Sequence, residues 1–193
     1  MSETPNFHHE KDLVGRILEG NEKEFRKLVE TYQALILRVS LQFTHSAEEA
    51  EDITQEVFIS IYKNLSNFRF KSSLKTWIYR IALSKGINHA NKEKRKAMMM
   101  IFTSYRNDHQ IPSLTKTDDD LCRKEMQNQL KKALSELPES QRVAFILHKI
   151  EDLPAHEVAE ILETSLSATE ALLHRARKNL QRKLRPIYQG REI

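Results

Sequence analysis

Two stretches of the sequence are rich in lysine and arginine and could hold the phosphates of a nucleic acid. Residues 80–96 contain six basic side chains and a single acid, Glu93, and residues 173–185 contain six basic side chains and no acid. One basic stretch is usually a solvated helix face, but two of them, each beside a pattern typical of DNA binding, indicate two contacts with a polyanion. Acids outnumber bases between residues 1 and 60, which favours a basic or neutral partner there.

Residues that could perform catalysis or bind a metal do not occur in the required spacing. The eight histidines do not form a His-Glu-x-x-His pattern, and the chain has no glycine-rich phosphate loop and no nucleophile elbow. The single cysteine, Cys122, excludes an intrachain disulfide and a cysteine-based zinc site. The sequence therefore predicts a protein that is not an enzyme and that uses no metal or other cofactor.

The composition favours a helical protein. The 193 residues suffice for one large domain or two small ones, and 39% are hydrophobic and 30% charged, with few glycines and prolines. No apolar run reaches the length needed to span a membrane, and residues 1–12 lack the apolar stretch of a signal peptide. We therefore expect a cytoplasmic protein with no membrane contact of its own.

Apolar periodicity predicts a first domain over residues 10–96. Capping patterns begin two helices, at Asn21 with Glu24 and at Ser46 with Glu49, and Ser72 or Ser73 begins a third. A shorter helix, closed by Gly20, precedes them. The predicted inward positions are Phe25, Leu28, Val29, Tyr32, Leu35, Ile36, Val39 and Phe43; Ala50, Ile53, Val57, Ile61 and Leu65; and Leu74, Trp77, Ile78 and Ile81. Four helices with short connections predict a compact bundle.

The rest of the chain predicts a linker and a second, smaller helical domain. Residues 97–120 are polar and aperiodic and are interpreted as a flexible linker, although Met98 to Phe102 could continue the third helix or dock on a partner. Residues 121–185 then contain short helices that end or begin at Pro138 and Pro154, and a long one opened by Ser167 with Glu170. The expected fold is all-α, with two small helical domains joined by the flexible linker.

The last two helices have the proportions of a helix-turn-helix. Residues 154–162 form the first helix, residues 163–166 a tight turn, and the second helix follows from Ser167. Ala159 is small enough for the two helices to approach closely. In such a motif the second helix enters the major groove of DNA. Any small helical bundle can show this spacing, so the pattern alone also permits a generic helical hairpin.

Several stretches, in the correct order, resemble the extracytoplasmic-function (ECF) type of RNA polymerase sigma factor, of the sigma-70 family. The motifs LPESQR at 137–142, EVAEIL at 157–162 and LHRARKNL at 173–180 resemble region 4 of these proteins. The motif DITQEVF at 52–58 resembles region 2.2, and FKSSLKTWIYRIA at 70–82 resembles regions 2.3 and 2.4. The resemblance implies a subunit that binds core RNA polymerase and directs transcription to promoters.

The resemblance implies that the predicted helix beginning at Ser46 binds core polymerase. The implied contacts are Asp52, Gln55, Glu56, Phe58 and Ile59. Residues 52, 55, 56 and 59 share one helical face, which agrees with this role. We favour a surface role for Phe58 because Ile53 and Val57 already fill the core stripe, although inward packing is the alternative.

The third helix and the loop before it are assigned to the minus-ten promoter element, which the family opens and reads as a single strand. Single-strand binding combines a basic track with aromatic and polar groups. The candidate contacts are Lys75, Thr76, Arg80, Ser84, Lys85 and Asn88, while Phe68, Phe70, Lys71 and Ser72 shape the loop. Trp77 is expected to pack in the core, with a base platform as the alternative.

The recognition helix is assigned to the minus-thirty-five element but departs from the family. Its candidate DNA contacts, within residues 154–174 and the basic stretch that follows, are Ser165, Ser167, Ala168, Glu170, Ala171, His174, Arg175, Arg177 and Lys178. Many members begin this helix Gly-Thr-Val-Lys-Ser-Arg, whereas this chain has Glu170 for the lysine and Leu172 for the arginine. We expect Glu170 to cap the helix, and base reading is the alternative.

Two further expectations concern partners. The resemblance implies an anti-sigma factor that wedges between the two domains and hides polymerase-binding surfaces. A long linker would allow the free protein to be extended. A stand-alone helix-turn-helix regulator is the alternative function. It would explain the second domain but would leave residues 52–96 without a role.

Overall fold

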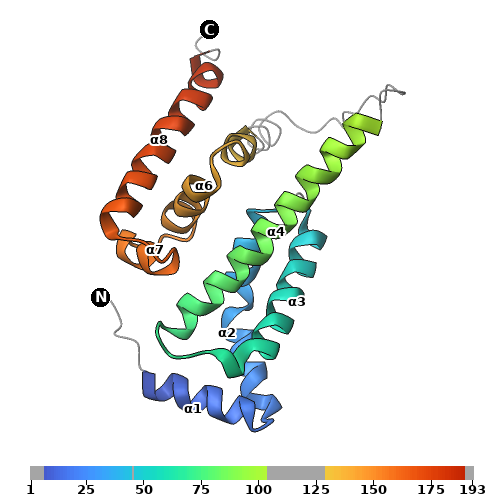
Figure 1. Cartoon of the computed structure of the whole chain (residues 1–193), viewed down its shortest axis with the longest axis vertical. Coiled ribbons are helices and arrows are strands. Elements are labelled where there is room, and N and C mark those ends of the chain that lie inside the picture. Colours follow the sequence, from blue (N-terminus) through green and yellow to red (C-terminus); the bar gives the residue numbers. More distant parts are fainter. Residues whose placement is uncertain (1–6, 45, 104–128, 190–193) are drawn as a thin grey trace, which may run out of the picture. The chain divides into compact units, whose positions relative to one another are not determined.

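The computed structural model describes residues 7–44, 46–103 and 129–189, and all of the regular elements in these ranges are helices (Figure 1). The predicted all-α class is therefore confirmed. By their contacts the residues fall into two compact units, 1–93 with 156–164, and 94–155 with 165–193. The sequence-based division instead placed residues 156–164 in the second domain. None of the described helices is long and apolar enough to cross a membrane.

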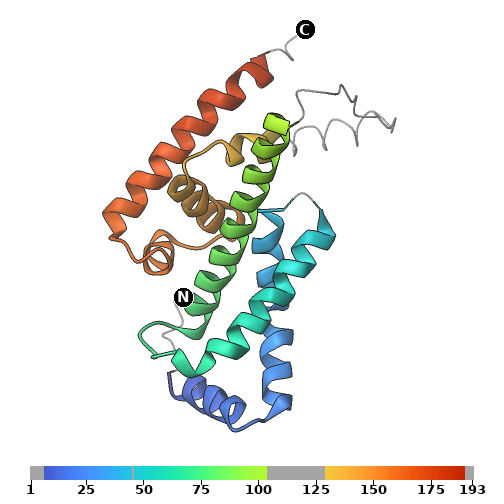
Figure 2. The same ribbon diagram turned by 45° about the vertical axis from the view of Figure 1, so that its right-hand side comes forward.

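The first unit contains a bundle of helices. The bundle consists of α1 (Phe7–Leu18), α2 (Glu22–Leu41), α3 (Ala47–Asn64), the short 3-10 helix η1 (Leu65–Asn67) and residues 74–93 of α4 (Leu74–Thr103). Figures 1 and 2 show α2, α3 and α4 side by side along their length, with α1 lying across one end. The α3 stripe is buried as predicted, at Ala50, Ile53, Val57, Ile61 and Leu65. Burial of this stripe removes apolar surface from water and holds the opposite face of α3 outward.

Side-chain caps fix where these helices begin. The Asn21 side chain accepts bonds from the backbone N–H groups of Lys23 (3.1 Å) and Glu24 (3.4 Å), and Ser46 accepts one from Glu49 (3.1 Å). For α4 the cap is Ser73, whose Oγ accepts the Thr76 N–H at 3.0 Å. These bonds satisfy donors that the first turn leaves without a partner. The predicted helix starts are confirmed, and the structure selects Ser73 over Ser72.

The buried face of α4 differs from the predicted stripe. Leu74 and Ile78 are buried, but Trp77 and Ile81 are only half-buried. The inward face instead continues through Tyr79, Ala82, Leu83 and Gly86. A Cβ added at Gly86 would lie 2.6 Å from a ring carbon of Phe43, so only glycine allows α4 and the end of α2 to approach this closely. The helix runs on to Thr103, so the predicted linker start at residue 97 is corrected; of the two alternatives for residues 98–102, the continuation of the helix holds.

The second unit contains a helix over 129–135, α6 (Glu139–Phe145), the π-helical turn η2 (Ile146–Ile150) and α8 (Leu166–Gln189). Its core joins the helix over 129–135 to α8 through Ala133, Leu134, Leu137, Ala176 and Leu180, with Phe145 and Leu184 packed against them. Pro138 lies just before α6 as its N-cap. Residues 104–120 of the predicted linker, and Leu121 and Cys122 of the predicted second domain, lie outside the described residues.

The helix-turn-helix order is present in the chain. The first helix, α7 (Ala155–Ile161), is separated from α8 by residues 162–165. In this turn Glu163 has a positive φ of 53°, and the Thr164 N–H donates to the Ala159 carbonyl at 3.0 Å. The predicted start of the second helix is corrected, because α8 begins at Leu166, before Ser167.

Candidate nucleic-acid interface

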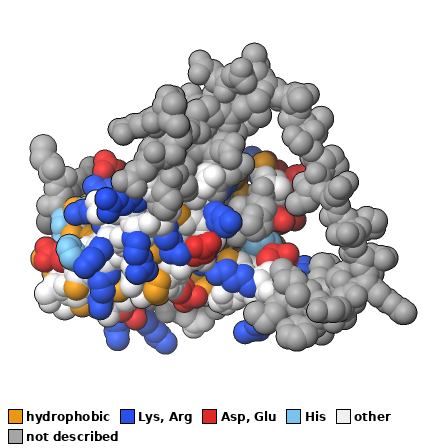
Figure 3. Space-filling model, turned by 90° about the horizontal axis from the view of Figure 1, so that it is seen from above, with side chains coloured by type: hydrophobic (Ala, Val, Ile, Leu, Met, Phe, Trp, Pro, Cys, Tyr) orange, Lys and Arg blue, Asp and Glu red, His pale blue; other side chains and the backbone are white. Residues whose placement is uncertain are grey.

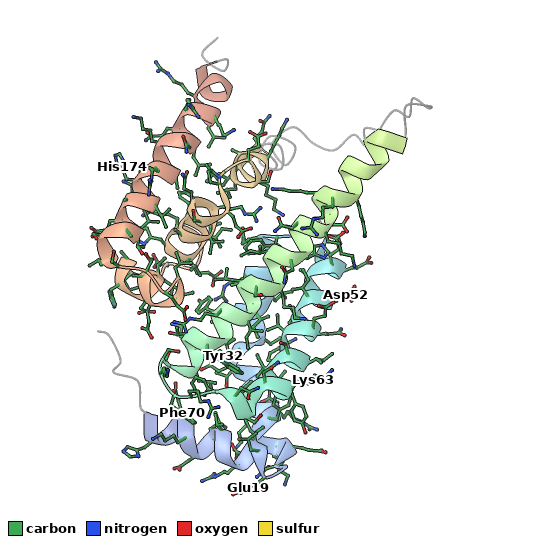
Figure 4. All side chains as sticks on the ribbon, viewed as in Figure 1. Glu19, Tyr32, Asp52, Lys63, Phe70 and His174 are labelled. Carbon is green, nitrogen blue, oxygen red and sulfur yellow. The ribbon has the colours of Figure 1, made fainter. Side chains whose placement is uncertain are left out.

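One face of α3 is exposed and carries polar, acidic and apolar side chains together. Asp52, Gln55, Glu56 and Ile59 are all exposed, and Figure 4 shows Asp52 and Lys63 directed away from the bundle. The Ile59 side chain is 53% exposed although it is fully apolar. A single exposed aliphatic side chain is ordinary, but an apolar patch rimmed by polar side chains is where a partner protein can bind.

The structure removes one residue from the predicted face and adds another. Phe58 is only 8% exposed, so the expected surface role is corrected and the inward-packed alternative holds. Tyr62, which the sequence analysis missed, is 58% exposed and lies one turn after Ile59. Its ring meets Phe25 of α2 edge-on, at a centroid distance of 5.0 Å. The helical spacing of Tyr62 from Ile59 was the signal that could have identified it.

The loop before α4 is built around three aromatic rings. The Phe68 ring centroid lies 4.7 Å from that of Phe70 and 5.2 Å from that of Trp77. Phe68 is buried, while Phe70 and Trp77 are half-buried. Phe70 also has a φ of 55°, a left-handed conformation that costs a non-glycine residue of order 1–3 kcal/mol. These ring contacts hold the strained loop in place. Trp77 packs against Phe68 and is also partly exposed.

Helix α1 supports the same loop, which the sequence analysis did not predict. The Leu74 N–H donates to the Glu10 carboxylate at 3.0 Å, at the first residue of α4. The Lys11 ammonium lies 5.6 Å from the centroid of the Phe70 ring, within the range of a cation–π contact. These contacts join residues more than fifty positions apart, so no local pattern could reveal them.

The other candidate minus-ten residues differ in accessibility. Lys71, Lys75, Ser84 and Asn88 are exposed, and Arg80 and Lys85 are half-buried. The Lys85 ammonium lies 3.4 Å from the Glu56 carboxylate of α3. By contrast, Ser72 and Thr76 are buried, at 6% and 7% exposure. The Thr76 hydroxyl accepts a hydrogen bond from Ser73 at 2.9 Å, so its position in the structure is that of a support for the helix start.

The candidate residues of α8 form an open surface. Ser165, Ser167, Glu170, Ala171, His174, Arg175, Arg177 and Lys178 are exposed, and Ala168 is half-buried. The opposite side of the helix is buried, at Thr169, Leu173, Ala176 and Leu180. Figure 4 shows His174 on the side of α8 that faces away from α6. Figure 3 shows lysine and arginine side chains gathered on the left of the view, where α8 lies in Figure 1. This basic surface fits a polyanion.

Polar contacts secure α8 against the rest of its unit. The Asn179 amide donates to the Gln141 side chain at 2.8 Å, and Lys183 pairs with Glu136. Arg142 is 4% exposed, and burial lowers the pKa of its guanidinium, an effect that Glu139 partly offsets. All of these contacts lie on α8 from residue 179 onward or on α6, so the first turns of α8 remain open.

Two family descriptions match the chain. Sigma-70 region 2 matches residues 28–96, which include the exposed α3 face and the loop before α4. Sigma-70 region 4 matches residues 127–180, which include α7 and the open surface of α8.

Similar proteins cover nearly the whole chain. It is 30% identical over 183 residues to the RNA polymerase sigma-H factor of Pseudomonas aeruginosa, which covers 92% of this chain and 95% of that protein. It is 26% identical over 187 residues to the ECF RNA polymerase sigma factor SigW of Bacillus subtilis, with 92% and 97% covered.

Solved structures share the fold. CnrH in complex with the cytosolic domain of CnrY has a TM-score of 0.66 at 21% identity, with 90% of this chain and 96% of that chain covered. The sigma factor RpoE in complex with the anti-sigma factor NepR from Bartonella quintana has a TM-score of 0.59 at 21% identity, with 84% and 98% covered.

A stand-alone regulator is not favoured, because the match to region 2 accounts for residues that such a protein would leave unexplained. The family is not a class of enzymes. With both regions matched in order and relatives covered almost end to end, the chain belongs to the sigma-70 family as a promoter-directing sigma factor of the ECF type.

Proposed function

We propose that the exposed α3 face, at Asp52, Gln55, Glu56 and Ile59, is the surface that binds core RNA polymerase. The observation that carries this proposal is the 53% exposure of Ile59 between acidic and amide side chains, on a helix whose opposite stripe is buried. Tyr62 extends the same surface by one turn. A protein bound in this way acts in the cytoplasm. It directs the polymerase to promoters and performs no catalysis itself.

A double variant tests this surface. Gln55→Ala with Ile59→Ala should weaken core binding at least tenfold, because a desolvated apolar anchor and its polar neighbour are lost together. Gln33→Ala with Leu18→Ala is the matched control, since Gln33 and Leu18 are also an exposed amide and an exposed aliphatic side chain. Both variants should keep the wild-type melting temperature. Equal core affinity of the two variants, measured by pull-down or fluorescence titration, would assign the polymerase surface elsewhere.

We propose that a first domain, residues 10–96, also opens the minus-ten element. Lys75, Ser84 and Asn88 are exposed along α4 and supply a cation and polar groups for a single strand, with Arg80 and Lys85 beside them. The loop with Phe68, Phe70 and Lys71 would hold the unstacked base, because aromatic rings and a strained backbone are already assembled there. Ser72, Thr76 and Trp77 support this loop and the start of α4.

Promoter opening can be separated from polymerase binding. Lys75→Ala and Asn88→Ala should each reduce permanganate reactivity of the melted promoter without reducing core affinity. Lys23→Ala is the control, because Lys23 is exposed on α2, outside both the proposed DNA surface and the proposed polymerase surface. If the footprints of both α4 variants equal those of Lys23→Ala, the strand follows another path.

We propose that a second domain, residues 121–185, binds the minus-thirty-five element through α8. The linker predicted over residues 97–120 would then begin after α4 ends at Thr103. Arg175, Arg177 and Lys178 are exposed and would hold phosphates, while Ser165, Ser167, Ala168, Glu170, Ala171 and His174 face the bases.

We propose that an anti-sigma protein controls the chain by covering the α3 face. Two of the solved structures that share this fold are complexes: CnrH with the cytosolic domain of CnrY, and the sigma factor RpoE with the anti-sigma factor NepR. If this proposal holds, purified core polymerase should displace the inhibitor captured with the tagged chain. Capture that core polymerase leaves unchanged would mean that inhibition uses another surface.

A further inference from the structure

The second turn of α8 carries a carboxylate that the helix does not use. Glu170 is exposed and is the fifth residue of α8. Among the described residues, none forms a hydrogen bond or an ion pair with its side chain. An exposed carboxylate is usually solvated, but on a helix proposed to enter a DNA groove it would lose that water on binding.

The structural reason predicted from the sequence is absent. Ser165, one residue before α8, is the cap: its Oγ accepts the Ala168 N–H at 3.2 Å, and its carbonyl accepts the Thr169 N–H at 3.0 Å. The predicted capping box of Ser167 with Glu170 is therefore wrong. Glu170 also lies beyond the first turn, where the helix dipole has largely faded.

The neighbours of Glu170 place it among the candidate base contacts. Ser167 lies three residues before it and His174 four residues after it, so the three side chains share one exposed stripe of α8. Arg175 and Lys178, also exposed, lie farther along the helix. If these cations hold phosphates, as proposed above, Glu170 faces the floor of the groove, where an unpaired carboxylate would repel DNA and lose its hydration.

We infer that Glu170 reads a cytosine in the minus-thirty-five element; this inference rests on the proposed role of α8. In the major groove only the exocyclic amino groups of cytosine and adenine donate hydrogen bonds. Adenine also presents its N7 acceptor beside the amino group, which repels a carboxylate, whereas cytosine presents a donor alone. Many relatives have a basic residue at this position, whereas in this chain Glu170 makes a contact specific for cytosine.

Promoter selection with the assembled holoenzyme tests the inference. Wild-type holoenzyme is incubated with a promoter library randomised over the minus-thirty-five element, and bound DNA is sequenced. We expect one base pair at which cytosine is preferred about tenfold, the effect of one good base contact. Glu170→Gln should move that preference toward adenine, because an amide can pair with the N6 and N7 groups of adenine. Glu170→Ala should lose the preference at that position alone.

Glu160→Gln is the matched control, since it removes an exposed carboxylate from α7 and should leave every preference unchanged. Identical base preferences for wild type and Glu170→Ala would overturn the inference, as would a change spread evenly over all positions. The proposed function fails separately: in that case the wild-type holoenzyme would enrich no minus-thirty-five sequence at all, whatever residue stands at position 170.

Discussion

The two surfaces proposed for DNA are built in opposite ways. In the loop before α4 the key groups contact one another: Phe68 lies against Phe70 and Trp77, and Phe70 has a left-handed backbone. On the first turns of α8 the key groups are exposed, and Glu170 contacts no other described side chain. One surface is packed and strained, and the other is open.

This difference corresponds to two kinds of DNA recognition. A duplex presents its base edges in a groove, so a helix with free side chains can read it without rearrangement. A single-stranded base needs an aromatic or polar pocket, and rings that already contact one another can exchange one contact for a base. The loop should therefore couple stability to function, whereas the α8 surface should not.

The largest expected effect is that of Phe68→Ala. Removing a ring that is 6% exposed should lower the free energy of unfolding by about 3 kcal/mol and should also abolish most promoter opening, because Phe70 and Trp77 lose their common support. Urea denaturation and permanganate footprinting measure the two effects. His174→Ala, at an exposed position of α8, should change unfolding by less than about 0.5 kcal/mol. Similar unfolding free energies for the two variants would remove the contrast between the surfaces.

A smaller effect is expected from the cations of α8. Arg175→Ala and Lys178→Ala should each reduce the slope of log affinity against log salt by about one, because each loses one phosphate contact and its released counterion. Their melting temperatures should stay at the wild-type value, since both side chains are exposed. Lys23→Ala, exposed on α2, controls for the loss of a positive charge. A slope equal to that of Lys23→Ala would exclude the residue from the phosphate contacts.

The smallest effect concerns the ion pair of Glu136 with Lys183, which lies in the last third of α8. The hydrogen bond from Lys183, aided by its charge, keeps the pKa of Glu136 below its ordinary value. A lowered folded-state pKa stabilises the protein above the ordinary carboxyl pKa, and this stabilisation is lost as pH falls through the lowered value. Glu136→Gln should therefore lower the melting temperature slightly at pH 7 and by less at pH 3, because part of the stabilisation is lost once the pH is below the ordinary carboxyl pKa. A difference that persists unchanged at pH 3 would show that the charge is not its cause.

Residue patterns within short stretches of the sequence determined much of the structure of this protein. The α3 stripe from Ala50 to Leu65, the caps at Asn21 and Ser46 and the exposed face around Gln55 all follow from helical periodicity and from donors that a helix start must satisfy. These features depend on residues within a few positions of one another. The ordered motifs of regions 2 and 4 likewise follow from sequence, which is why the family was evident before the fold.

Tertiary structure alone decided the features that depend on distant residues. Phe58 is buried and Tyr62 exposed because neighbouring helices determine how wide the covered stripe of α3 is. Glu10 and Lys11 reach the loop before α4 only because α1 lies across the end of the bundle. At α8 two serines could each cap a helix, and the backbone of the turn after α7 selected Ser165. That choice leaves the carboxylate of Glu170 free, because a cap can bond only to the first turn of the helix that actually forms.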